Sequence, residues 1–82
     1  MNQQEALDHI RQALARIVPD ADFAAIAPHD KLRDVLELDS LDYLRFIEAL
    51  TTTSAVPITE EDYTHFTTLA DGAEFLAARS TP

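Results

Sequence analysis

The stretch ELDSLDYLRFIEAL, residues 37–50, decides the fold class of this 82-residue chain. Advancing about 100° per residue along it separates two faces, as in an amphipathic helix. The apolar arc that should face the core consists of Leu44, Phe46, Ile47 and Leu50. The opposite arc, which should face water, consists of Asp42, Arg45, Glu48 and Thr52. We therefore expect a helix from Ser40 to about Thr52.

The start of this helix has two unusual residues. Leu41 falls among the charged positions, and Ser40 precedes it in the first turn. One interpretation is structural: Asp39 or Ser40 caps the helix, and scattered exposed leucines are common. The other is functional, because the free N–H groups and the dipole of a helix start favour a phosphate on the Ser40 oxygen. The residues by themselves leave both interpretations open.

The other periodic segments also have helical spacing. A first helix is expected from about Gln3 to Val18, with Asn2 and Glu5 as its capping pair and Pro19 ending it. Two shorter helices are expected at about 60–66 and 69–79, each after a capping pair. These pairs are Thr59 with Asp62, and Thr68 with Asp71.

The connection between the first two long helices, from about Pro19 to Asp39, is unusually long for a compact domain. Its apolar residues indicate that it packs onto the protein, with a short helical turn near Lys31 to Leu36. Gly72 is the only glycine, which disfavours hairpins and glycine-rich phosphate loops. We therefore predict an all-α fold, a small four-helix bundle with a long first loop, as a single domain over residues 1–82.

The composition restricts the function. Six Lys and Arg against fifteen Asp and Glu give a net charge of −9, which disfavours nucleic acid and anionic membranes and favours basic protein partners. The chain has no cysteine, which excludes disulfides and a thiol nucleophile of its own. It shows neither a long apolar run nor a secretory signal, so we expect a cytoplasmic monomer without membrane insertion.

Other candidate sites are weak. His9, His29 and His65 are scattered without metal-ligand spacing, and Asp20 and Asp22 lack the rest of a calcium loop. No convergent catalytic groups or nucleotide motif occur, so we expect neither a metal site nor enzyme activity. Tyr43 and Tyr63 are interpreted as packing or interface residues.

The run LELDSLD, residues 36–42, is the basis of a family resemblance. The sequence resembles an acyl carrier protein: a first amphipathic helix, a long loop, Asp-Ser-Leu opening the second helix, and two shorter helices. The resemblance covers nearly the whole chain. It implies that Ser40 carries a 4′-phosphopantetheine arm, derived from coenzyme A, whose thiol holds an acyl or aminoacyl group as a thioester. Ser40 would then be a tether and not a nucleophile.

The resemblance also implies partners. These are a phosphopantetheinyl transferase, a loading ligase and a downstream synthase or transferase. Asp39 would help to position the divalent metal in the transferase complex, Leu41 would be an apolar anchor, and Asp42 and Glu48 would attract basic surfaces. Carriers of this type can shelter an acyl chain, but core packing is the favoured role of Phe46, Ile47 and Leu76.

Several positions depart from the family pattern. Glu37 stands where glycine is most common, Arg45 where a glutamate is common, Thr51 and Thr52 replace acidic residues, and Ser54 replaces a frequent aromatic residue. We therefore expect a specialised carrier, in secondary-metabolite synthesis, lipid modification or aminoacyl transfer, and not a housekeeping carrier of fatty acid biosynthesis. The alternatives are an aminoacyl or peptidyl carrier and an unmodified helical adaptor of the same fold.

Overall fold

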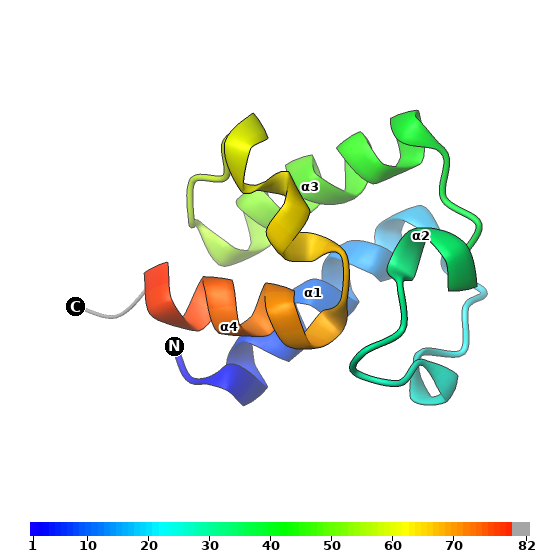
Figure 1. Ribbon diagram of the computed structural model, residues 1–82, viewed down its shortest axis with the longest axis horizontal. Coiled ribbons are helices and arrows are strands. Elements are labelled where there is room, and N and C mark those ends of the chain that lie inside the picture. Colours follow the sequence, from blue (N-terminus) through cyan, green and yellow to red (C-terminus); the bar gives the residue numbers. More distant parts are fainter. Residues whose placement is uncertain (80–82) are drawn as a thin grey trace.

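The computed structural model describes residues 1–79 and shows a helical bundle (Figure 1). Its elements are α1 (Gln3–Ile17), η1 (Phe23–Ala25), α2 (Leu32–Val35), α3 (Ser40–Ser54), η2 (Glu60–Phe66) and α4 (Leu69–Arg79). Helix α1 packs against both α3 and α4, and η2 packs on α4. Residues 1–79 contain no strand, and none of their helices is long and apolar enough to cross a membrane. The predicted all-α fold is confirmed.

The helix starts follow the predicted capping pairs. At α1, the Glu5 N–H donates to Asn2 Oδ1 at 2.8 Å, and the Asn2 N–H donates to Glu5 Oε1 at 3.1 Å. At α4, the Asp71 N–H donates to Thr68 Oγ1 at 3.1 Å. These bonds satisfy N–H groups that have no partner inside a helix, so short local patterns were enough to place the starts.

The end of α3 comes two residues later than expected, at Ser54. Hydroxyl groups at its end donate to carbonyls one turn earlier, including Thr51 to the Ile47 oxygen at 3.0 Å and Ser54 to the Leu50 oxygen at 2.7 Å. The next residue, Ala55, ends the helix in the left-handed region with φ 59°. The hydroxyl groups of Thr51 and Ser54 are therefore satisfied within the helix, which continues to Ser54 although these residues have low helix propensity.

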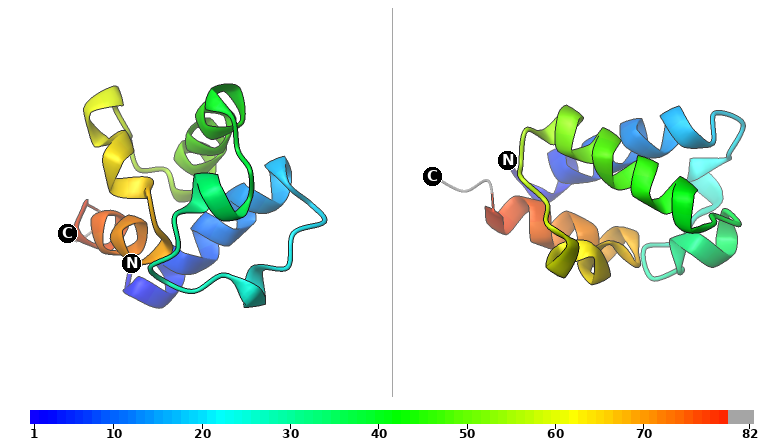
Figure 2. Two further views of the ribbon diagram at one scale, coloured as in Figure 1. Left: turned by 45° about the vertical axis from the view of Figure 1, so that its right-hand side comes forward. Right: turned by 90° about the horizontal axis from the view of Figure 1, so that it is seen from above.

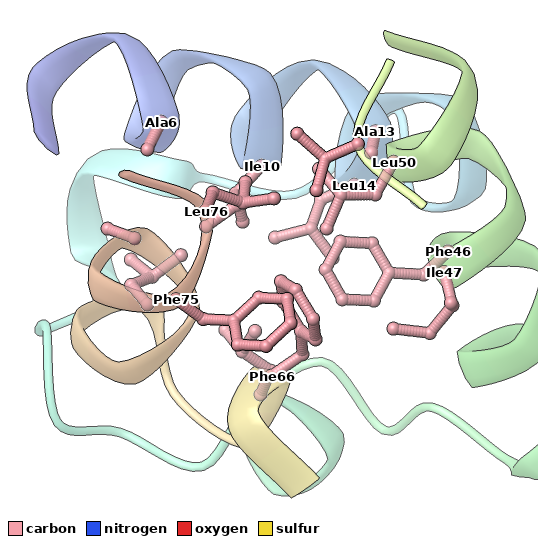
Figure 3. Close-up of a cluster of buried hydrophobic side chains, with 14 of the residues drawn as sticks. Ala6, Ile10, Ala13, Leu14, Phe46, Ile47, Leu50, Phe66, Phe75 and Leu76 are labelled. Atoms are coloured by element: carbon pink, nitrogen blue, oxygen red, sulfur yellow. The ribbon is translucent and has the colours of Figure 1, made fainter. Parts of the chain in front are cut away.

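The centre of the core is a row of three aromatic rings from three elements (Figure 3). Phe66 of η2 meets Phe46 of α3 edge-on at 6.4 Å and Phe75 of α4 edge-on at 5.3 Å between ring centroids. Ile10 and Leu14 of α1 belong to the same buried cluster. Such edge-to-face pairs add to the burial of large apolar surfaces, so η2 is held although it is only a 3₁₀ helix.

Gly72 is explained by the packing around η2. It lies in the interior of α4, where glycine costs about 1 kcal/mol relative to alanine. A Cβ at this position would lie 3.0 Å from Phe66 Cδ1 and 3.1 Å from Ile10 Cδ1. Glycine therefore allows α4 to approach the core closely.

The long connection is fixed to the bundle by its own anchors. Leu32 and Leu38 are 1% and 6% exposed, and the Leu32 N–H donates to the Thr67 carbonyl at 2.9 Å. The Ala70 N–H also donates to the Pro28 carbonyl at 3.0 Å. The predicted turn near Lys31 to Leu36 is confirmed as α2, whereas η1 was not predicted. Because these anchors hold the connection against the bundle, α2 lies beside the N-terminal end of α3 (Figure 2).

Asp62 connects η2 with the end of α4. Its Oδ2 accepts hydrogen bonds from the Thr59 N–H at 3.1 Å and the Thr59 hydroxyl at 3.0 Å, and its Oδ1 lies 3.6 Å from Arg79 Nη2. The backbone hydrogen bond from Thr59 is the main cause that lowers the pKa of Asp62. The Thr59 hydroxyl and the Arg79 and His65 charges act in the same direction, and burial opposes them.

We predict that Asp62→Asn lowers the free energy of unfolding at neutral pH. A lowered carboxyl pKa stabilises the fold above the unfolded-state value of 3.8, and this contribution disappears as the pH falls through the folded-state pKa. The difference in the free energy of unfolding between wild type and Asp62→Asn should therefore become smaller in acid. Urea unfolding across this pH range measures it, with the exposed Asp20→Asn as the control. A difference that does not change with pH would contradict the role of the charge.

Candidate functional site

Ser40 is the first residue of α3, and its side chain is exposed. The N-cap is Asp39, whose Oδ1 accepts the Asp42 N–H at 2.8 Å. Asp39 thus performs the capping that the sequence alone could have assigned to either residue. The Ser40 hydroxyl is not needed for the cap and lies at the surface, where the helix start favours negative charge.

Arg33 of α2 contacts Ser40 directly, and the sequence analysis did not identify it. Its Nη2 donates to Ser40 Oγ at 3.4 Å, and its Nε donates to the Leu38 carbonyl at 3.5 Å. The guanidinium carbon lies 5.4 Å from the centroid of the Tyr43 ring, within cation–π range. The docking of the long loop creates this contact, and the only sequence signal is a lone arginine inside the predicted turn.

A surface pocket of about 350 Å³ lies beside Ser40. Its lining is aromatic, aliphatic and hydroxylic apart from one arginine, and contains no carboxylate. The lining residues are Arg33, Ser40, Tyr43, Leu44, Tyr63, Thr64 and Thr67. A second hollow of about 390 Å³ shares Arg33, Tyr43 and Thr67 with it and adds Lys31, Asp34 and Leu38.

Tyr43 and Tyr63 join α3 to η2 at this pocket. The Tyr43 hydroxyl donates to the Tyr63 carbonyl at 2.6 Å, and their rings stack with centroids 6.5 Å apart. Burial raises the pKa of Tyr43 above its ordinary value of 10.0, and the nearby Arg33 charge opposes this shift. The phenol therefore remains protonated at neutral pH and keeps its hydrogen bond, so the tyrosines pack as the sequence interpretation allowed.

Leu44 is a correction to the sequence analysis. It was expected in the core, but it is 39% exposed and lines the pocket. On the helical wheel Leu44 lies about 60° beyond Ile47, while Tyr43 lies near the middle of the buried arc. The predicted arc was too wide on the side of Leu44. Phe46, Ile47 and Leu50 are buried as expected.

The other predicted recognition residues lie on the outer surface of α3 or at its start. Leu41 is 55% exposed, as expected for an apolar anchor. Asp39, Arg45 and Glu48 are exposed, and Asp42 is partly exposed. The structure therefore brings Asp39, Leu41 and Asp42 around Ser40 and places Arg45 and Glu48 further along the helix. Their roles in partner recognition remain predictions.

The side chains considered for metal binding or cargo do not form a second site. Within residues 1–79, no group of three or more His, Asp or Glu side chains is arranged to hold a metal ion. His65 instead stacks on Phe75 at 4.8 Å between centroids. Phe46, Ile47 and Leu76 lie in the packed core, the role that the sequence analysis favoured.

The helical bundle with an exposed serine at the start of α3 is the arrangement of a phosphopantetheine carrier. Comparison with protein families agrees, because the family described as "Phosphopantetheine attachment site" matches residues 8–76. The chain belongs to this family, whose domain is the site of covalent 4′-phosphopantetheine attachment. No curated protein matches the chain. An exposed hydroxyl beside a pocket that contains one arginine and no carboxylate fits the group chemically.

Glu37, which departs from the family pattern, has a strained backbone. Its φ is 53°, in the left-handed region. It follows the end of α2, and the Leu38 N–H donates to the Arg33 carbonyl at 3.0 Å. This is the arrangement of a Schellman motif, in which glycine usually occupies the left-handed position. The backbone conformation thus gives a physical reason for the family's glycine at this position.

We predict that Glu37→Gly stabilises the protein by about 1 kcal/mol, because it relieves the cost of the left-handed conformation. Asp34→Gly, inside α2, is the matched control and should destabilise the protein by about a few tenths of a kcal/mol, because glycine has a lower helix propensity than aspartate. Urea unfolding of both variants measures the two effects. Destabilisation by Glu37→Gly would show that the Glu37 side chain makes a larger contribution than the strain costs.

Proposed function

We propose that this protein is an acyl carrier protein that bears 4′-phosphopantetheine on Ser40 and holds acyl intermediates as thioesters. The supporting observation is that Ser40 is the one suitable serine. The chain has three serines, and Ser80 lies outside both the family match and the described residues. The Ser54 hydroxyl is half-buried and donates to the Leu50 carbonyl at 2.7 Å. Ser40 is exposed at a helix start.

The chain's own part in this function is to present the attachment point. Asp39 caps α3, so the Ser40 oxygen can form the ester bond to phosphorus without loss of the cap. The bond to the nucleotide part of coenzyme A would break, and the serine proton would leave to a base of the transferase. When bound, the cofactor supplies the thiol that forms the thioester. No catalytic set is required in this chain.

We propose that the start and outer face of α3 form the recognition surface for partner enzymes. Asp39 would assist the transferase, Leu41 would insert into an apolar depression, and Asp42 and Glu48 would face basic groups. The exposed leucine supports this, because apolar surface beside an attachment point is what a partner can bury. Arg45 interrupts the acidic face, which supports a specialised carrier with dedicated loading and synthase partners.

An aminoacyl carrier is the second candidate function. It would use the same arm on Ser40 and differ only in cargo. The core favours a short cargo of this kind, because Phe46 and Leu76 are fully buried and Ile47 is 2% exposed in a closely packed cluster. A long acyl chain would have to displace these side chains. Loading of the modified protein by amino-acid ligases against fatty-acid ligases would separate the two cargoes.

We predict that Ser40→Ala abolishes modification. The purified protein would be incubated with coenzyme A, magnesium and a broad-specificity phosphopantetheinyl transferase, and its intact mass measured. Wild type and Ser54→Ala should each gain one 4′-phosphopantetheine group, and Ser40→Ala should gain none while keeping its helical circular dichroism. Modification of the Ser40→Ala protein would contradict the proposed attachment point.

We predict that Arg45→Glu changes loading of the modified protein by its native partner enzyme several-fold, and that the effect weakens with added salt. A charge at the edge of an interface acts mainly on association rates, and salt screens it. Steady-state kinetics measure kcat/KM for the loading step. Arg16→Glu, an exposed position on α1 with the same charge change, is the control. Equal behaviour of the two variants would show that position 45 does not set partner choice.

A further inference from the structure

Among the residues that the structure describes, Arg33 has no carboxylate partner, although the chain has a net charge of −9. Within residues 1–79 the ion pairs are Arg11 with Asp8 and Arg79 with Asp62. Arg33 instead contacts a carbonyl, a serine hydroxyl and an aromatic ring. A guanidinium has five N–H donors, and these contacts use only some of them. Arg33 therefore retains unused N–H donors beside Ser40, and its charge forms no direct ion pair among the described residues.

The groups around Ser40 are mostly acidic, so a positive charge among them would stabilise a phosphate on Ser40. Glu37, Asp39 and Asp42 all lie within three residues of Ser40 in the sequence. A phosphodiester on Ser40 would add another negative charge among them, and like charges repel at short range. The N–H groups of the α3 start offset part of this repulsion. Arg33 supplies a full positive charge, and its Nη2 already lies 3.4 Å from the oxygen that would carry the phosphorus.

We propose that Arg33 is the positioning residue of the modified protein: it binds the phosphodiester on Ser40 and turns the first part of the arm toward the pocket beside α3. This inference rests on the proposed attachment at Ser40. Arginine is well suited, because its planar guanidinium binds phosphate oxygens through paired hydrogen bonds. The Tyr43 ring and the Leu38 carbonyl hold the guanidinium in place before the phosphate is attached.

The pocket chemistry agrees with this direction. Leu44 and the rings of Tyr43 and Tyr63 offer apolar surface, and Thr64 and Thr67 add hydroxyl groups. The portion of pantetheine next to the phosphate contains methyl groups, a hydroxyl and an amide, and it is uncharged. No carboxylate lines this pocket, so the uncharged portion meets no fixed negative charge there. Arg33 lines both this pocket and its neighbour, and is therefore placed to direct the arm.

The test uses the full chain, modified enzymatically and checked by intact mass, and compares wild type with Arg33→Gln, Arg33→Lys and Arg16→Gln. The readout is the ³¹P resonance of the phosphodiester, together with the Arg33 Nε–H resonance before and after modification. We expect modification to shift the Nε–H signal in wild type. We also expect Arg33→Gln to shift and narrow the ³¹P line, Arg33→Lys to keep an intermediate position, and Arg16→Gln to match wild type.

The change in melting temperature on modification gives an independent readout. Modification should raise the melting temperature more, or lower it less, in wild type than in Arg33→Gln, because only in wild type does the phosphate gain an arginine partner. Because Arg33 is exposed, both variants at this position should fold. Absence of modification on Ser40 would overturn the attachment proposal and the role of Arg33 with it. Modification on Ser40 with a ³¹P resonance insensitive to Arg33→Gln would overturn the role of Arg33 alone.

Discussion

The burial of Leu32 is the constraint on which the arrangement around Ser40 depends. Its side chain enters the core, and its N–H bonds to the Thr67 carbonyl between η2 and α4. Together with the burial of Leu38 and the hydrogen bond from Ala70 to the Pro28 carbonyl, these contacts hold a connection of about twenty residues, and they offset the conformational entropy that its ordering costs. Once Leu32 is fixed, α2 lies next to the start of α3, and Arg33 reaches Ser40. A contact between residues seven positions apart thus depends on an anchor in a different part of the bundle.

The transition from core to surface at this point takes only two residues. Leu38 is buried, Asp39 turns its carboxylate onto the first turn of α3, and Ser40 is exposed. The left-handed Glu37 makes the preceding turn tight enough for this. The turn at Glu37 and the Asp39 cap therefore fix where α3 starts, while the Ser40 hydroxyl, the proposed attachment oxygen, remains accessible. Such a site combines a fixed position with free access for a modifying enzyme.

The sequence predicted those features that depend on neighbours along the chain. The capping pair of Asn2 with Glu5 follows from a spacing of three residues, and its hydrogen bonds are present. The exposure of Leu41 follows from its place on the helical wheel, and Leu41 is exposed. Leu44 was misplaced because a helical wheel does not show how far the neighbouring η2 covers the edge of α3. Arg33 was missed for a similar reason: its position relative to Ser40 follows from the docking of the loop through Thr67, which no local pattern encodes.

A carrier of this kind must attract basic partner enzymes, which requires negative charge, and must also hold a phosphodiester, which requires positive charge. The two requirements act at different distances. Approaching basic enzymes respond to the net charge of −9 at distances comparable with the Debye length, about 8 Å at physiological salt. A phosphodiester responds to the groups in contact with it, where a single guanidinium outweighs more distant carboxylates. An acidic chain can therefore attract basic partners and still accept another negative charge, provided that one arginine lies at the attachment point. Arg33 lies at the proposed attachment point, where its guanidinium donates to the Leu38 carbonyl and the Ser40 hydroxyl.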